Sequence, residues 1–146
     1  MTASAVALAA DHAGFELKGA IEQRGLEVLD LGTHDAGSVD YADLADALAA
    51  ALEQGRASRG VLVCGTGIGI SIAANRHRHV RAALCHDVTT ATFARQHNGA
   101  NVLALGSSLL QPDVALRIID VWLSTPMTEA RYIRRLLKVR RLEDSF

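Results

Sequence analysis

The segment that most constrains the fold of this chain covers residues 60–75 and reads GVLVCGTGIGISIAAN. A short apolar, β-branched run ends at Cys64, a glycine-rich turn follows, and a helix-compatible stretch comes directly after the turn. This order is typical of a buried strand that delivers one side chain to the end of a sheet. Glycines let backbone N–H groups approach a ligand, and the start of a helix adds positive potential. A thiol at this place has reason to be reactive.

The rest of the chain alternates between strand and helix patterns in the same way. Strands are predicted at residues 6–10, 27–31, 61–64, 80–85 and 102–105. Helices are predicted at residues 15–24, 41–54, 70–76, 88–97, 112–123 and 128–141. Five strands joined by helical crossovers predict an α/β fold, a five-stranded parallel sheet covered by helices on both faces, in a single domain over residues 1–146. Ligands of such folds bind at the carboxyl ends of the strands.

Composition excludes several classes of function. The chain has 146 residues, of which 49% are hydrophobic and 21% charged, as expected for one folded domain. A formal charge of −1 and an aromatic content of 4% argue against nucleic-acid binding. Both cysteines, Cys64 and Cys85, lie in buried-strand patterns, which argues against a disulfide and favours a reducing, cytoplasmic location. No apolar stretch reaches the ~18 residues of a membrane span, so no membrane association is expected.

The glycine turn itself leaves two interpretations of Cys64 open. Gly65, Gly67 and Gly69 lack the spacing of a dinucleotide fingerprint, and no lysine follows as in a P-loop. A turn whose N–H groups hold an anion fits better. Cys64 is then a candidate base or nucleophile, although a free cysteine is also a common inert core residue. Cys85 has no such turn, and we expect it to serve in packing.

The histidines do not predict a metal site, because no pair has convincing ligand spacing with carboxylates. His12 follows the first strand, where either a ligand contact or a loop role is expected. His97 precedes the fifth strand, and Asn98 and Gly99 after it also suit a plain helix C-cap.

Two arginines of the last predicted helix, Arg131 and Arg135, are four residues apart and share one helix face. Such a fork could hold a phosphate. From this pattern alone, a solvated basic face of an amphipathic helix is the better interpretation.

Taken together, these segments resemble the type B ribose-5-phosphate isomerase family, which includes galactose-6-phosphate isomerase subunits. The matching pieces cover residues 11–18, Asp40 and Tyr41, residues 64–75, residues 95–98 and residues 101–106. The resemblance implies a Rossmann-like fold without a dinucleotide, no metal and no other cofactor. It also implies a homodimer or tetramer whose active sites lie at the interface, with the helix at about 128–141 contributing to the site or the dimer.

The same resemblance implies roles for individual residues. Cys64 would be the base that moves a proton between C2 and C1 of the open sugar, Thr66 would relay protons between O1 and O2, and His97, from the partner chain, would open the furanose ring. The implied substrate-binding residues are Asp11, His12, Gly65, Gly67, Gly69, Ser71, Asn98, Arg131 and Arg135. Among these, the glycine loop and Ser71 would offer N–H groups to the enediolate, and His12 and the two arginines would bind the phosphate. Some family members use a Glu base from the glycine loop, but Ile70 occupies that position here.

The chain departs from the family pattern at several positions. Ser108 stands where the family often has a phosphate-binding arginine, and Gly99 stands where Asp is usual. A Gly-Gly-Arg-His motif before the last helix is replaced by residues 129–132, which read EARY. The predicted function is therefore an aldose–ketose isomerase of a small phosphorylated sugar, with ribose 5-phosphate to ribulose 5-phosphate, a pentose phosphate reaction, as the first choice. A tetrose or hexose phosphate, a free sugar, or a non-catalytic sugar-phosphate-binding subunit are the alternatives; a nicotinamide-dependent oxidoreductase is not expected.

Overall fold

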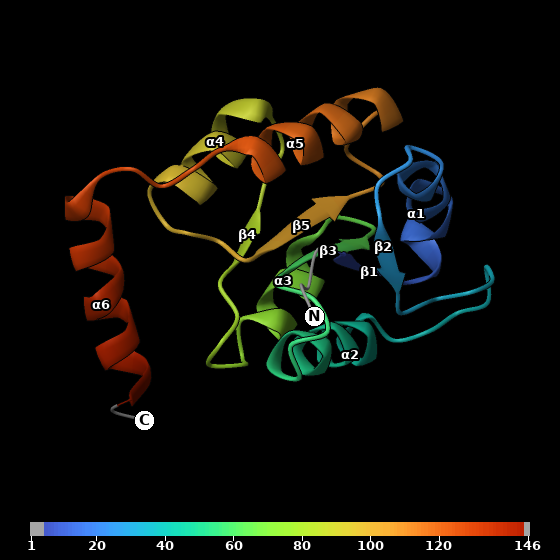
Figure 1. Ribbon diagram of the computed structural model, residues 1–146. Coiled ribbons are helices and arrows are strands. Elements are labelled where there is room, and N and C mark those ends of the chain that lie inside the picture. Colours follow the sequence, from blue (N-terminus) through green and yellow to red (C-terminus); the bar gives the residue numbers. More distant parts are fainter. Residues whose placement is uncertain (1–4, 145–146) are drawn as a thin grey trace.

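The structure, a computed structural model, describes residues 5–144, with side chains up to residue 140. Strands and helices alternate along this part of the chain (Figure 1). The strands are β1 (Val6–Ala10), β2 (Val28–Asp30), β3 (Arg59–Cys64), β4 (Ala82–Leu84) and β5 (Val102–Gly106). The helices are the 3₁₀ turn η1 (His12–Gly14), α1 (Phe15–Glu22), α2 (Tyr41–Glu53), α3 (Ile68–Ala74), α4 (Val88–Gln96), α5 (Pro112–Ser124) and α6 (Ala130–Asp144). The predicted order of elements is confirmed.

All strand pairs of the sheet are parallel, in the order β2-β1-β3-β5-β4. The chain leaves β1 first toward β2 and later returns to place β3 on the other side, so the strand order reverses between β1 and β3. Crevices at such reversals are where open α/β sheets bind ligands. The residue after β1, Asp11, donates its N–H to the carbonyl of Val63 over 3.1 Å. Asp11 therefore lies beside Cys64, the last residue of β3.

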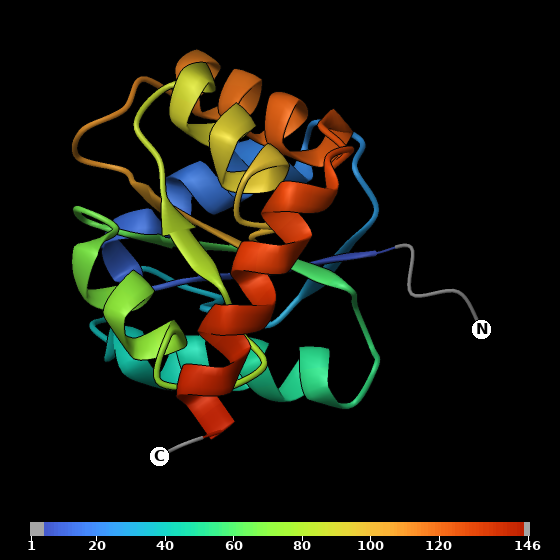
Figure 2. The same ribbon diagram turned by 90° about the vertical axis from the view of Figure 1, so that its left-hand side faces the viewer.

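Alternate residues of the central strands face two separate cores. Val61 and Val63 pack with α1, α4 and α5, whereas Leu62 and Cys64 pack with α2 and α3 on the opposite face. Figure 2 shows these helical layers on either side of the sheet. The predicted sandwich of a five-stranded parallel sheet between two helical layers is confirmed.

Helix α6 stands outside both layers, on the side of the sheet where β4 lies (Figures 1 and 2). Over residues 130–140 only Tyr132 is buried, and the apolar side chains of Ile133, Leu137 and Val139 are exposed. Within residues 5–144, no helix combines the length and the apolar character that crossing a membrane requires.

Several element boundaries differ from the sequence prediction for local reasons. Helix α3 begins at Ile68 rather than residue 70, because Gly67 takes a left-handed conformation (φ 78°) and serves as the N-cap. Strand β4 is shorter than residues 80–85, because only three of its residues pair with β5, its one neighbour in the sheet. The last helix continues to Asp144, beyond the predicted residue 141.

Candidate active site

Cys64 lies at the carboxyl end of β3, where a tight turn leads into α3. Its side chain is buried, and its Sγ accepts the N–H of Gly67 over 3.1 Å. A Cβ added at Gly67 would lie 2.5 Å from Cδ1 of Leu84 and 2.9 Å from the carbonyl carbon of Leu105. Only glycine fits this conformation and this space. The turn thus fixes the sulfur against the start of α3, as the residue pattern predicts.

The other polar groups of the turn are partly used by the fold itself. The Ser71 N–H donates to the carbonyl of Gly67 (3.2 Å), and its hydroxyl donates to the carbonyl of Ile68 (2.8 Å). The amides of Gly67 and Ser71 are thus both hydrogen-bonded within the turn and the first part of α3. Gly69 lies in the first turn of α3, where N–H groups lack partners within the helix. The exposed Thr66 accepts the Ile68 N–H at its Oγ1 (3.3 Å).

The loop after β5 joins the same strand ends and adds a residue that the sequence analysis did not single out. The Ser107 hydroxyl lies 2.8 Å from the carbonyl oxygen of Ala13 and 3.1 Å from that of Cys64. The Ser108 N–H donates to the carbonyl of Gly65 over 2.9 Å. The ends of β1, β3 and β5 are therefore held together beside the sulfur. The only sequence signal for Ser107 is its place directly after a predicted strand.

Asp11 and His12 occupy the turn after β1. One carboxylate oxygen of the buried Asp11 accepts the N–H groups of Ala13 (3.0 Å) and Gly14 (3.1 Å), so Asp11 caps η1. The exposed His12 accepts the N–H of Val39 at Nδ1 over 3.2 Å. A neutral ring with Nδ1 as acceptor carries its proton on Nε2. His12 therefore offers an N–H donor to a ligand at this edge.

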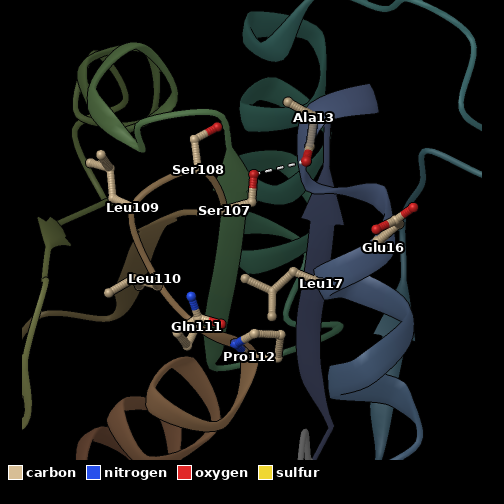
Figure 3. Close-up of a pocket in the computed structure, with 9 residues that line it drawn as sticks. All are labelled: Ala13, Glu16, Leu17, Ser107, Ser108, Leu109, Leu110, Gln111 and Pro112. Carbon is tan, nitrogen blue, oxygen red and sulfur yellow. Dashed lines mark hydrogen bonds between the residues drawn. The ribbon is translucent and has the colours of Figure 1, made fainter.

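A pocket of about 600 Å³ opens next to Ser107 and Ser108, between the N-terminal ends of α1 and α5 (Figure 3). It is lined by Ala13, Glu16, Leu17, Ser107, Ser108, Leu109, Leu110, Gln111 and Pro112. Glu16 is the one charged residue of this lining. The pocket thus supplies no basic group in place of the arginine that Ser108 replaces.

The remaining candidate residues gather elsewhere, around the end of α4 and the start of α6. The imidazole of His97 is stacked between two rings, with centroids 4.5 Å from Phe93 and 4.3 Å from Tyr132. The guanidinium carbons of Arg131 and Arg135 lie over the Tyr132 ring, 5.0 and 5.9 Å from its centroid. Phe93 and Tyr132 were not predicted. The i,i+4 spacing of Phe93 and His97 is a sequence signal from which Phe93 could have been found.

The loop that carries His97 and Asn98 is tied down by two further arginines. Arg95 donates to the carbonyl of Ala100 (2.7 Å), and Arg81 donates through Nε (3.1 Å) and Nη2 (3.0 Å) to the carbonyl of Gly99. Burial, together with the nearby charges of Arg59 and Arg81, lowers the pKa of Arg95. Arginine side chains thus hold the backbone carbonyls of this loop and place positive charge beside it.

The candidate residues therefore form two groups on one chain. The cysteine group comprises Asp11, His12, the turn of residues 64–71, Ser107 and Ser108. The histidine group comprises His97, Asn98, Arg131, Tyr132 and Arg135. The first follows the carboxyl ends of the strands, whereas His97 precedes β5, whose five residues span roughly 16 Å. A single chain does not bring the two groups together.

Two other features bear on the chemistry. Cys85 lies in the core, as expected, and burial, with a smaller contribution from Asp87, raises the pKa of its thiol despite a hydrogen bond with Thr90. Of the two cysteines, Cys64 is therefore the one at a strand end and in the glycine turn. In the part of the chain that the structure describes, no group of three or more His, Cys, Asp or Glu side chains could hold a metal ion.

The geometry agrees with comparisons to known proteins. Residues 6–139 match a family model described as Ribose/Galactose Isomerase. Ribose-5-phosphate isomerase B of Escherichia coli is 39% identical and covers 94% of this chain and 95% of its own length. D-erythrulose-4-phosphate isomerase of Pectobacterium atrosepticum is 43% identical and covers 81% of each chain. The structure of ribose-5-phosphate isomerase B from Clostridium thermocellum superposes with a TM-score of 0.92 at 42% identity, over 96% of this chain and 97% of that one.

The family model and the E. coli relative each extend over nearly the whole chain. The chain belongs to the ribose/galactose isomerase family.

Proposed function

We propose that this chain is an aldose–ketose isomerase that interconverts ribose 5-phosphate and ribulose 5-phosphate through a cis-enediolate. Sugar-phosphate isomerisation is the chemistry of the family, and the E. coli relative named for ribose 5-phosphate matches nearly the whole chain. The observation that carries the mechanism is the place of Cys64, at a strand end beside the strand reversal, with its sulfur held by the Gly67 N–H.

The protons that must move in this reaction define a role for each catalytic residue. His97 opens the furanose ring by transferring the proton of the O1 hydroxyl to the ring oxygen while the bond between C1 and the ring oxygen breaks, which gives the open-chain aldose. The Cys64 thiolate removes the proton from C2, and the electron pair of that bond forms the C1–C2 double bond of an enediolate. The thiol returns the proton to C1. The hydroxyl proton lost from O2 is needed at O1, and Thr66, exposed at the mouth of the turn, relays it.

Binding in this proposal uses both groups of residues. The first-turn amide of Gly69 and the turn at Gly65 face the developing enediolate. Asp11 and Asn98 orient the substrate, and His12, Arg131 and Arg135 bind the phosphate. Because the two groups lie at opposite ends of the parallel strands, a second copy of the chain must supply the histidine group to each cysteine group. A two-fold dimer makes two equal sites in this way.

A tetrose phosphate is the second candidate substrate. It is favoured by Ser108, with no basic side chain in the pocket beside it, and by the relative named for D-erythrulose 4-phosphate. Kinetics on four-, five- and six-carbon sugars, each with and without phosphate, distinguish the candidates. Equal turnover of phosphorylated and free sugars would contradict the role of the arginines.

Exchange of the two catalytic residues tests the base and the shared site together. We expect Cys64→Ala and His97→Ala each to lose isomerase activity, whereas Cys85→Ala, the matched control in the core, keeps it. In co-expressed mixed dimers of the two inactive variants, one site of two is intact. Random pairing then restores about a quarter of the wild-type rate. Near-full activity of Cys64→Ala would refute the base, and silent mixed dimers would refute the shared site.

A further inference from the structure

Tyr132 contacts three members of the histidine group, and none of the roles proposed above involves it. Its ring stacks on the imidazole of His97 with a centroid distance of 4.3 Å and an interplanar angle of 27°. Phe93 covers the opposite face of the same imidazole at 4.5 Å and 19°. A ring covered on both faces keeps its plane. Tyr132 therefore helps to set the direction in which His97 can pass a proton.

The same tyrosine also touches both arginines of α6. Its hydroxyl oxygen accepts Nη2 of Arg131 over 3.1 Å, and the guanidinium carbons of Arg131 and Arg135 lie 5.0 and 5.9 Å from its ring centroid. Both arginines are otherwise exposed, so their long side chains have many rotamers to lose on binding an anion. Contact with a fixed aromatic face reduces that freedom and orients the planar guanidinium groups.

Tyr132 can serve this purpose because it is itself fixed. It is 8% exposed, whereas every other residue over positions 130–140 is exposed or half-buried. It is thus the most buried contact of residues 130–140 with the rest of the chain. The loop of His97 approaches α6 again at Gly99, where an added Cβ would lie 3.0 Å from Met127 and 3.2 Å from Leu136.

We propose that Tyr132 is a positioning residue that sets the proton-transfer histidine and the two phosphate-binding arginines in one fixed arrangement. This proposal rests on the isomerase function above. The tyrosine does not touch reacting atoms; it acts through His97 on the ring-opening step and through Arg131 and Arg135 on phosphate binding. It should therefore affect kcat through one neighbour and KM through the others.

Three variants separate these effects. Tyr132→Phe keeps the stack and removes the hydroxyl, and we expect KM for ribose 5-phosphate to rise about threefold with kcat unchanged. Tyr132→Leu removes the ring, and we expect kcat to fall and KM to rise by about tenfold each. Lys138→Ala, on an exposed position of the same helix, controls for general changes in α6 and should match the wild type.

Two readouts do not depend on turnover. NMR of the imidazole protons should show the full ring-current shift of His97 in the wild type and in Tyr132→Phe, and a clearly smaller shift in Tyr132→Leu, where only Phe93 remains stacked on the ring. Titration with inorganic phosphate should show weaker binding in both variants. Wild-type shifts and wild-type phosphate affinity in a folded Tyr132→Leu would overturn the proposal. A wild-type enzyme that turns over no sugar phosphate would instead refute the function, while these two readouts still decide the role of Tyr132.

Discussion

Replacement of Gly67 by alanine tests whether the turn after β3 is as constrained as its geometry indicates. An alanine at φ 78° carries the left-handed penalty of about 1–2 kcal/mol. The new Cβ also meets two atoms at less than 3.0 Å. Cδ1 of Leu84 can move because it ends a flexible side chain, but the carbonyl carbon of Leu105 belongs to the backbone of a central strand. Overpacking of this kind costs about 1–3 kcal/mol.

The expected loss of stability for Gly67→Ala is therefore about 2–5 kcal/mol. Gly55→Ala is the matched control, because Gly55 has a similar φ of 70° and nothing within 4 Å of the added Cβ. Only the backbone penalty of about 1–2 kcal/mol should appear there. Gly19→Ala, inside α1 with open space around the added Cβ, should instead stabilise the chain by about 0.5–1 kcal/mol.

Urea unfolding followed by the fluorescence of Trp122, the single tryptophan and fully buried, measures all three variants. A Gly67→Ala variant no less stable than Gly55→Ala would show that the turn has room and that the reasoning from the added Cβ is wrong. Ketose formation by the folded fraction gives a second result. Because the Gly67 N–H holds the sulfur of Cys64, we expect activity to fall even under conditions where the variant is folded.

Three further predictions concern charge. Glu129→Gln removes the carboxylate that pairs with Nε of Arg131 at 3.0 Å. Because Arg131 is then free to bind phosphate, KM for sugar phosphates should fall about two- to fivefold. The control Asp113→Asn, which breaks an exposed ion pair on α5, should not change KM. Ser108→Arg should lower KM for ribose 5-phosphate about tenfold and leave KM for free sugars unchanged. Equal effects on both would contradict the prediction that this position lies near the phosphate. Burial opposes ionisation of Asp30, but hydrogen bonds from Lys18 and Gly32 outweigh this effect and lower the pKa of Asp30. Burial likewise opposes the charge of Lys18, but its contacts with Asp30 and Glu22 outweigh this effect and raise the pKa of Lys18. Stability should therefore fall as the pH drops through and below 3.8, the ordinary pKa of Asp, and also as the pH rises above 10.5, the ordinary pKa of Lys. In urea unfolding measured across pH, Lys18→Met should flatten both the acid and the alkaline decrease in stability. An unchanged acid decrease would exclude Asp30 as its cause.

Local patterns predicted most of the fold because each pattern has one physical solution here. The buried run of β1 matches its predicted bounds, since every one of its residues is buried. Pro112 begins α5, where a missing N–H costs little. The start of α3 was misjudged because an apolar helical pattern does not reveal that Gly67 turns left-handed and caps the helix two residues earlier.

The candidate site was predictable only as far as residues adjacent in sequence define it. The turn at Cys64 is one continuous segment, so its chemistry could be inferred from residue order. The stack of Tyr132 on His97 joins residues 35 positions apart, and no periodicity links them. Similarly, nothing in the sequence alone fixes the strand order that brings the loops after β1, β3 and β5 together around Cys64.

Both groups carry less positive charge than the family pattern would give them. In the cysteine group, Ser108 stands where the resemblance implies an arginine, and Glu16 lines the adjoining pocket. In the histidine group, Glu129 replaces a glycine and pairs with Arg131. The two changes lie on different elements and act in the same direction. Since every sugar phosphate carries the same phosphate charge, we expect selection among them to depend on pocket shape and on the neutral groups of Ser108 and Gln111.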